Sequence, residues 1–184
     1  TLAAELQSKI NGTTALRDEG VLRIVRESDM ILQLVQAGNL RSSLLILRAA
    51  REHGQLHRVV LASDTPTGTG VMPLAVLKTA CELSSLGGLP AAETLALATG
   101  NNARAWELDS GRIAVGAPAD LVVLDAPWGG VADDALGAIA NGDIPGISAV
   151  IIDGQVRVLR SRNTPAARRL ATVRPPLPHL CGGH

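Results

Sequence analysis

Aromatic residues are almost missing from this 184-residue sequence, which has no phenylalanine, no tyrosine and only Trp106 and Trp128. Proteins that bind single-stranded nucleic acid stack the bases on several aromatic faces, and this composition excludes such a platform. An excess of basic charge is also missing, because 17 basic side chains balance 17 acidic ones. Without a basic field to attract DNA or RNA, we expect no nucleic-acid partner.

Long apolar runs are absent as well, since none approaches the roughly 20 residues of a membrane-spanning helix. No stretch near the N-terminus has the pattern of a secretory signal. We therefore expect no membrane partner. Cysteine is scarce, and Cys81 and Cys181 lie far apart in the sequence. Two free thiols are favoured over a disulfide, and this interpretation places the protein in the reducing cytoplasm.

The sequence is rich in aliphatic side chains, and hydrophobic residues make up 46% of the total. Such a chain can bury a core, and that core must be aliphatic. Residues 1–108 predict an alternation of buried strands and helices, which is typical of a parallel sheet or barrel. The strands are expected at 30–35 and 58–64, and the helices at 18–27, 40–51, 73–85, 90–98 and 101–108.

The pattern changes after Asp109 to short apolar runs separated by turn residues. Strands are predicted at 111–116, 119–125, 149–152 and 155–158. Asp153-Gly154 lies between the last two, and this pair is a strong signal for a type I′ hairpin because both positions need a positive φ. Residues 109–163 therefore predict a small antiparallel unit. Residues 164–184 are rich in Arg and Pro, and we expect a flexible tail there.

Asp64 is the main candidate for chemistry. A carboxylate at the C-terminal end of a buried parallel strand stands where barrel enzymes build their active sites. The following residues, 65–70, are small and polar with two glycines, so a ligand can approach their backbone amides. An ordinary turn or helix-cap aspartate is an equally good interpretation from the spacing alone.

The histidines are weaker candidates for a metal site. His53 and His57 have the i, i+4 spacing of a zinc pair, but Gly54 interrupts any helix that would hold them on one face. His57 also precedes the strand that Asp64 ends. Seven residues of strand span roughly 23 Å, which places the two side chains at opposite ends of the sheet.

Two segments resemble the amidohydrolase superfamily: residues 111–125 are similar to the strands by which those chains leave the barrel, and residues 98–104 are similar to the helix start before them. Residues 63–70, 142–148 and 161–165 resemble the enamidases within that superfamily. The resemblance implies a C-terminal fragment of the family fold. The fold class is α/β, with the last units of a (β/α)8 TIM-type barrel in residues 1–108 and the C-terminal half of a small β-sandwich in residues 109–163.

The resemblance also implies a site. Asp64 would bind a divalent metal, zinc or iron in a binuclear centre, and act as general base on metal-activated water. The substrate would be a cyclic amide, and Thr65, Gly68, Thr69 and Gly70 would bind it. The complete enzyme of this family is expected to be a homo-oligomer.

Lys9 departs from the family pattern, because the resemblance places a metal-binding histidine at this position. The histidine pair of the first barrel strand is also absent from the sequence. The isolated chain is therefore expected to be inactive. The alternative function is a non-catalytic remnant or subunit that lacks the metal site.

Overall fold

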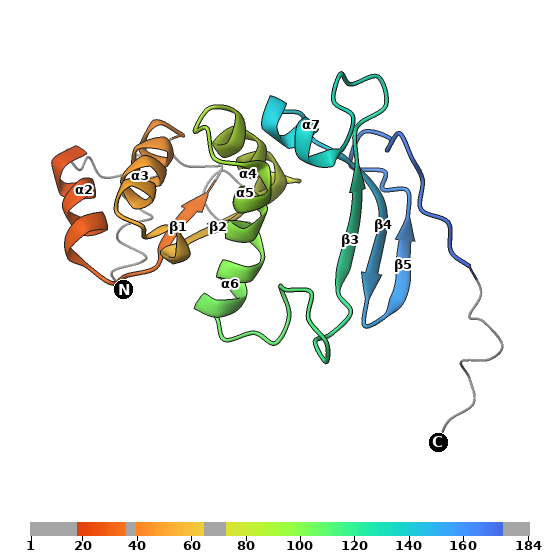
Figure 1. The fold of residues 1–184 in the computed structure, drawn as a ribbon, viewed down its shortest axis with the longest axis horizontal. Helices are drawn as coiled ribbons and strands as arrows, with labels where there is room; N and C mark the ends of the chain where they lie inside the picture. The colour runs from red at the N-terminus through yellow and green to blue at the C-terminus, as the bar shows by residue number, and fades with distance from the viewer. Residues whose placement is uncertain (1–17, 36–39, 65–72, 175–184) are drawn as a thin grey trace.

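The structure, a computed structural model, describes residues 18–35, 40–64 and 73–174 (Figure 1). Two parts lie side by side: a parallel pair of strands covered by helices, and an antiparallel sheet of three strands (Figure 1). The prediction of a mixed α/β chain is confirmed.

The parallel pair consists of β1 (Leu32–Val35) and β2 (Val59–Ala62), with Leu32 opposite Val59. The surrounding helices are α2 (Asp18–Glu27), α3 (Leu40–Glu52), α4 (Ala75–Ser85), α5 (Ala91–Ala98) and α6 (Gly100–Ala105), and a 3-10 turn, η1 (Leu56–Arg58), precedes β2. The two predicted strands and their parallel direction are therefore confirmed. In the described part of the chain, no helix is long and apolar enough to span a membrane.

Aliphatic side chains form the core between these elements, as the composition predicts. Both strands are apolar at every position except Gln33, which is typical of strands covered on both faces. The buried side chains come from α2, both strands, α3, α4 and α5, and include Val25, Leu32, Leu34, Ile46, Leu61 and Leu83.

Helix boundaries differ slightly from the predicted ones. The helix predicted from residue 73 begins at Ala75, because Leu74 has a left-handed backbone with φ 61°. A further helix, α7 (Ala135–Asn141), was not predicted, since seven residues are too few for a clear helical period. The Asp134 side chain accepts a hydrogen bond from the Gly137 N–H and caps its first turn.

The antiparallel sheet has the order β3 (Leu121–Asp125), β4 (Gly146–Ile152), β5 (Gln155–Leu159). Asp153 and Gly154 join the last two strands with φ values of 52° and 70°. Both values are positive, as a type I′ turn requires, and the predicted hairpin is confirmed.

The strand predicted at 111–116 is wrong. This segment makes bends and turns, and Ile113 is 91% exposed. A strand needs a neighbour to pair its backbone N–H and C=O groups, and no described strand lies beside this segment. Apolar alternation alone was therefore a misleading signal.

The predicted flexible tail is also wrong for residues 164–174. The chain returns alongside the sheet, where Ala167 forms an isolated antiparallel bridge with Pro127. The Trp128 N–H donates to Ala166 O at 2.7 Å, and the Arg168 N–H donates to Ala126 O at 2.9 Å. These bonds attach the returning segment to the end of β3. Residues 175–184 lie outside the described residues.

Candidate functional site

Asp64 lies just beyond the C-terminal end of β2, as predicted. Because β1 and β2 are parallel, this end of β2 is at the same edge of the sheet as Val35, where β1 ends. The Asp64 side chain is partly buried. Its backbone has φ 54°, a left-handed conformation that is uncommon for a residue with a side chain. Aspartate adopts this conformation more readily than most residues, and Asp153 has nearly the same φ in its hairpin turn, so the evidence for a functional role is the position of Asp64 at the sheet edge.

Two asparagines at the start of α6 contact β2, and sequence reasoning missed both of them. Asn101 Nδ2 donates to Leu56 O at 2.8 Å and to Val59 O at 2.9 Å. Asn102 Nδ2 donates to Leu61 O at 2.9 Å. The only local signal is an Asn-Asn pair after Gly100, and its partners lie more than 40 residues earlier.

The other predicted site residues cannot be placed beside Asp64. Thr65, Gly68, Thr69 and Gly70 lie outside the described residues, as does Lys9.

The histidines lie away from Asp64. His57 lies in η1, before β2 begins, and His53 is exposed after α3. The prediction that His57 and Asp64 stand at opposite ends of the same strand is confirmed.

A metal centre is not assembled by the described residues alone. Among residues 18–35, 40–64 and 73–174, no group of three His, Cys, Asp or Glu side chains is placed to hold an ion. A catalytic zinc usually takes three protein ligands, and Asp64 is one carboxylate. This donor set does not fit a metal without further ligands.

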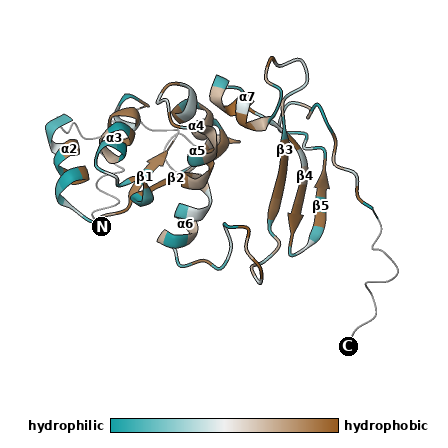
Figure 2. Ribbon diagram, in the orientation of Figure 1, coloured by the Kyte–Doolittle hydropathy of each residue, from teal (hydrophilic) through white to brown (hydrophobic). Residues whose placement is uncertain are grey.

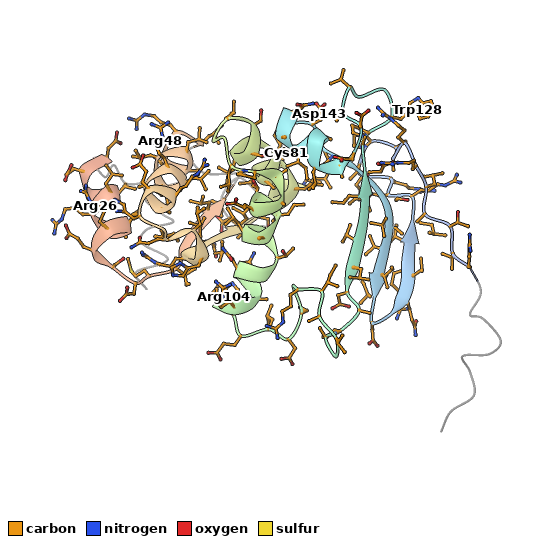
Figure 3. The ribbon with its side chains drawn as sticks, in the orientation of Figure 1. Arg26, Arg48, Cys81, Arg104, Trp128 and Asp143 are labelled. Atoms are coloured by element: carbon orange, nitrogen blue, oxygen red, sulfur yellow. The ribbon has the colours of Figure 1, made fainter. Side chains whose placement is uncertain are left out.

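Cys81 is a poor candidate for a nucleophile. Its thiol is free and buried, and Sγ donates a hydrogen bond to Asp143 O at 3.3 Å. Both residues are labelled where α4 meets α7 (Figure 3). Burial raises the pKa of the Cys81 thiol to about 11, so the reactive thiolate is scarce at neutral pH. Cys181 lies outside the described residues.

A shallow hollow of about 430 Å³ lies on the side of the antiparallel sheet. Its lining residues belong to the loops on either side of α7 and to the returning segment: Pro127, Trp128, Gly129, Gly130, Val131, Asp143, Ile144 and Pro165. None of them comes from β1, β2 or the residues that directly follow these strands. The hollow is therefore separate from the Asp64 site.

Comparisons with known proteins agree on one family. The model of the amidohydrolase family matches residues 11–157. The enamidase of Eubacterium barkeri is 45% identical over 170 residues, which are 92% of this chain and 44% of that enzyme. A crystal structure of enamidase, described as a new member of the amidohydrolase superfamily, superposes with a TM-score of 0.85 and 44% identity, over 88% of this chain and 42% of that one.

A more distant structure shares the fold alone. The β-aspartyl dipeptidase of Fervidobacterium islandicum AW-1 has a TM-score of 0.50 and 24% identity, over 77% of this chain and 38% of that one. The chain thus spans less than half the length of each of these relatives. Since the family model covers most of the sequence, the chain belongs to the amidohydrolase family.

Proposed function

We propose that this chain forms the C-terminal portion of a hydrolase that opens a C–N bond of a cyclic amide. The observation that carries the proposal is Asp64, a partly buried carboxylate with a left-handed backbone at the C-terminal edge of the parallel strands. The 45% identity to an enamidase supports the cyclic amide as the substrate class.

Asp64 acts first as a base and then as an acid in this proposal. Its carboxylate accepts a proton from the water that attacks the amide carbonyl. The protonated side chain then gives that proton to the leaving nitrogen. Thr65, Gly68, Thr69 and Gly70 follow Asp64 directly, and we assign them to substrate binding.

A divalent metal, zinc or iron, would lower the pKa of the attacking water when bound. Because the described residues do not fit such an ion by themselves, the remaining ligands must come from other residues.

The domain boundaries are part of the same proposal: residues 1–108 form the last barrel units, and residues 109–163 form one share of a β-sandwich. The apolar composition of the antiparallel sheet supports the second assignment (Figure 2). Its strands expose Val122 to 54%, Ile152 to 50% and Leu159 to 53%. In a sandwich, side chains of this kind pack against a second sheet.

The test is to express the chain together with the coding sequence that precedes Thr1 in frame. Hydrolysis of a cyclic enamide and bound metal are then measured for the parent and for Asp64→Ala. We expect Asp64→Ala to lower turnover at least about 100-fold, the size of a general acid–base contribution. The matched control is Asp29→Ala, which removes the same charge at the other end of β1.

Unchanged turnover and unchanged metal content in Asp64→Ala would remove Asp64 from the mechanism. If the parent itself fails to hydrolyse cyclic amides while it folds and binds metal, the substrate class is wrong. A folded parent that neither binds metal nor hydrolyses amides would favour the non-catalytic alternative.

A further inference from the structure

The two asparagines of α6 bind opposite ends of β2. A side-chain amide carries two N–H hydrogens. Asn101 has two backbone carbonyl acceptors, and Asn102 has three, of which Leu97 O is the most distant at 3.5 Å. Asn101 joins Leu56 O and Val59 O, at the beginning of the strand. Asn102 donates to Leu61 O, near the end of the strand, and to Ala98 O at 3.1 Å. Ala98 is the last residue of α5.

The Asn102 amide therefore links the strand end to a well-anchored helix end. Ala98 closes α5, whose Leu97 is buried in the core and whose Thr94 is also buried. Asn101, also in α6, attaches this helix to Leu56 O and Val59 O before and in β2. An anchor of this kind moves little relative to the core.

Asp64 depends on this link because of its backbone. Only two residues separate Leu61 from Asp64, and so the carbonyl that Asn102 binds is within about 10 Å of Asp64 along the chain. Asp64 has a left-handed backbone, and its surroundings help to hold such a conformation, which costs some free energy even for aspartate. If the end of β2 frayed, Asp64 would relax to an ordinary backbone and its carboxylate would move.

We propose that Asn102 is a positioning residue, which holds the Asp64 carboxylate in place by joining the C-terminal end of β2 to the C-terminal end of α5. Asn101 secures the beginning of the same strand and has no such effect on Asp64. A catalytic effect of Asn102 rests on the proposed function. Its effect on the position of the Asp64 carboxylate does not.

The experiment compares Asn102→Ala with Asn101→Ala in the full 184-residue chain by NMR. It measures amide hydrogen exchange along β2 and the ¹³C chemical shift of the Asp64 carboxyl. Asn101→Ala loses two hydrogen bonds to backbone carbonyls and Asn102→Ala loses three, one of them long at 3.5 Å, so the variants make the same side-chain change at opposite ends of β2. Asn102→Ala should speed exchange at residues 61–64 about tenfold and shift the Asp64 signal toward that of a solvated aspartate. Asn101→Ala should speed exchange at residues 56–59 and leave the Asp64 signal in place.

The proposal is overturned if the Asp64 signal moves equally in both variants, or in neither. Should Asn102→Ala not fold, Asn102→Ser serves in its place, because its hydroxyl retains one donor, and an intermediate shift of the Asp64 signal is expected. A Ser variant with the parent's Asp64 signal and exchange rates would contradict the proposal. These readouts need no turnover and no metal, so their failure is distinguishable from a failure of the hydrolase proposal.

Discussion

Asp125, at the end of β3, shows how a single residue secures the returning segment 164–174. Its side chain is almost fully buried, and its two carboxylate oxygens accept hydrogen bonds from Arg169. The Arg169 guanidinium donates at 2.6 and 2.9 Å, and the Arg169 N–H donates at 2.6 Å. These hydrogen bonds hold the pKa of Asp125 well below its usual range. The ionised carboxylate is therefore the form that stabilises the fold.

Substitution of Asp125 by Asn should lower the free energy of unfolding by about 1–3 kcal/mol at neutral pH. Because the pKa of Asp125 is lower in the folded state than in the unfolded state, its contribution is complete above the unfolded pKa of about 3.9. The contribution is lost as the pH falls from there through the lower, folded pKa. Urea unfolding of parent and variant between pH 7 and pH 2 measures this difference.

Asp133→Asn is the control for that measurement, since the Asp133 side chain is fully exposed and lies 3.8 Å from Arg168. Its effect should be small at every pH. A difference between Asp125→Asn and the parent that stays constant down to pH 2 would contradict the assigned role of the charge.

At the scale of elements, Arg58 joins α2 to the parallel strands. Its guanidinium is buried and donates to Val25 O at 3.0 Å, in the last turn of α2, and to Met30 O at 2.9 Å, just before β1. It also donates to Gln55 Oε1 at 2.7 Å. A cation at this position satisfies carbonyls at the C-terminal end of the helix and interacts favourably with its dipole.

Arg58→Met keeps the length of the side chain but leaves these buried carbonyls without their donors. We expect a loss of about 2–4 kcal/mol in the free energy of unfolding, measured by urea denaturation. Arg48→Met removes an arginine that is exposed on α3 and should change the free energy by less than about 0.5 kcal/mol (Figure 3). Equal effects of the two substitutions would show that the buried hydrogen bonds of Arg58 do not contribute to the free energy of unfolding.

Gly146, the first residue of β4, allows the returning segment to lie against the sheet. A Cβ atom at this position would overlap the backbone N and Cα of Ala167. Gly146→Ala should therefore displace residues 164–174, and limited proteolysis of that segment should become several-fold faster. Gly100→Ala is the control, because its Cβ would meet only Gly111 O at 3.6 Å. If Gly146→Ala were cleaved at the parent's rate, the close approach of Gly146 to Ala167 would not be what holds residues 164–174 against the sheet.

At the scale of the whole molecule, apolar surface remains on the antiparallel sheet. Val122 pairs with Val150, which pairs with Val158, so the three form one cross-strand row. Val122 is 54% exposed and Val158 is 40% exposed, and β5 is an edge strand. Exposed apolar faces and open strand edges favour association with other chains.

The 184-residue chain is therefore expected to self-associate, and size-exclusion chromatography with light scattering measures this. The double substitution Val122→Thr with Val158→Thr should shift the population toward monomer, because it makes the row polar. Val131→Thr changes an 86% exposed side chain in a loop and should not shift it. A parent chain that is monodisperse and monomeric at micromolar concentration would contradict the prediction.

The sequence alone was sufficient for features that depend on neighbouring residues. The apolar runs around residues 32–35 and 59–62 predict buried strands because all their side chains except Gln33 are apolar. Asp153-Gly154 predicts its hairpin because the two residues tolerate positive φ values. The position of Asp64 after a strand followed from the same local patterns, and so did the choice of this residue as the candidate carboxylate.

Only the tertiary structure decided the features that join distant residues. Asn102 reaches Leu61 across 41 positions, and Arg169 reaches Asp125 across 44. A local window contains one partner of each pair and therefore predicts neither bond. Residues 111–116 fail in the opposite sense, because their alternation is strand-like but backbone pairing needs a neighbour that the described fold does not place there. Local chemistry thus determined which segments could become helices, strands and turns. Long-range pairing decided which of them did. The physical reason is that hydrogen bonds and packing between distant segments offset the conformational entropy lost when the chain is ordered.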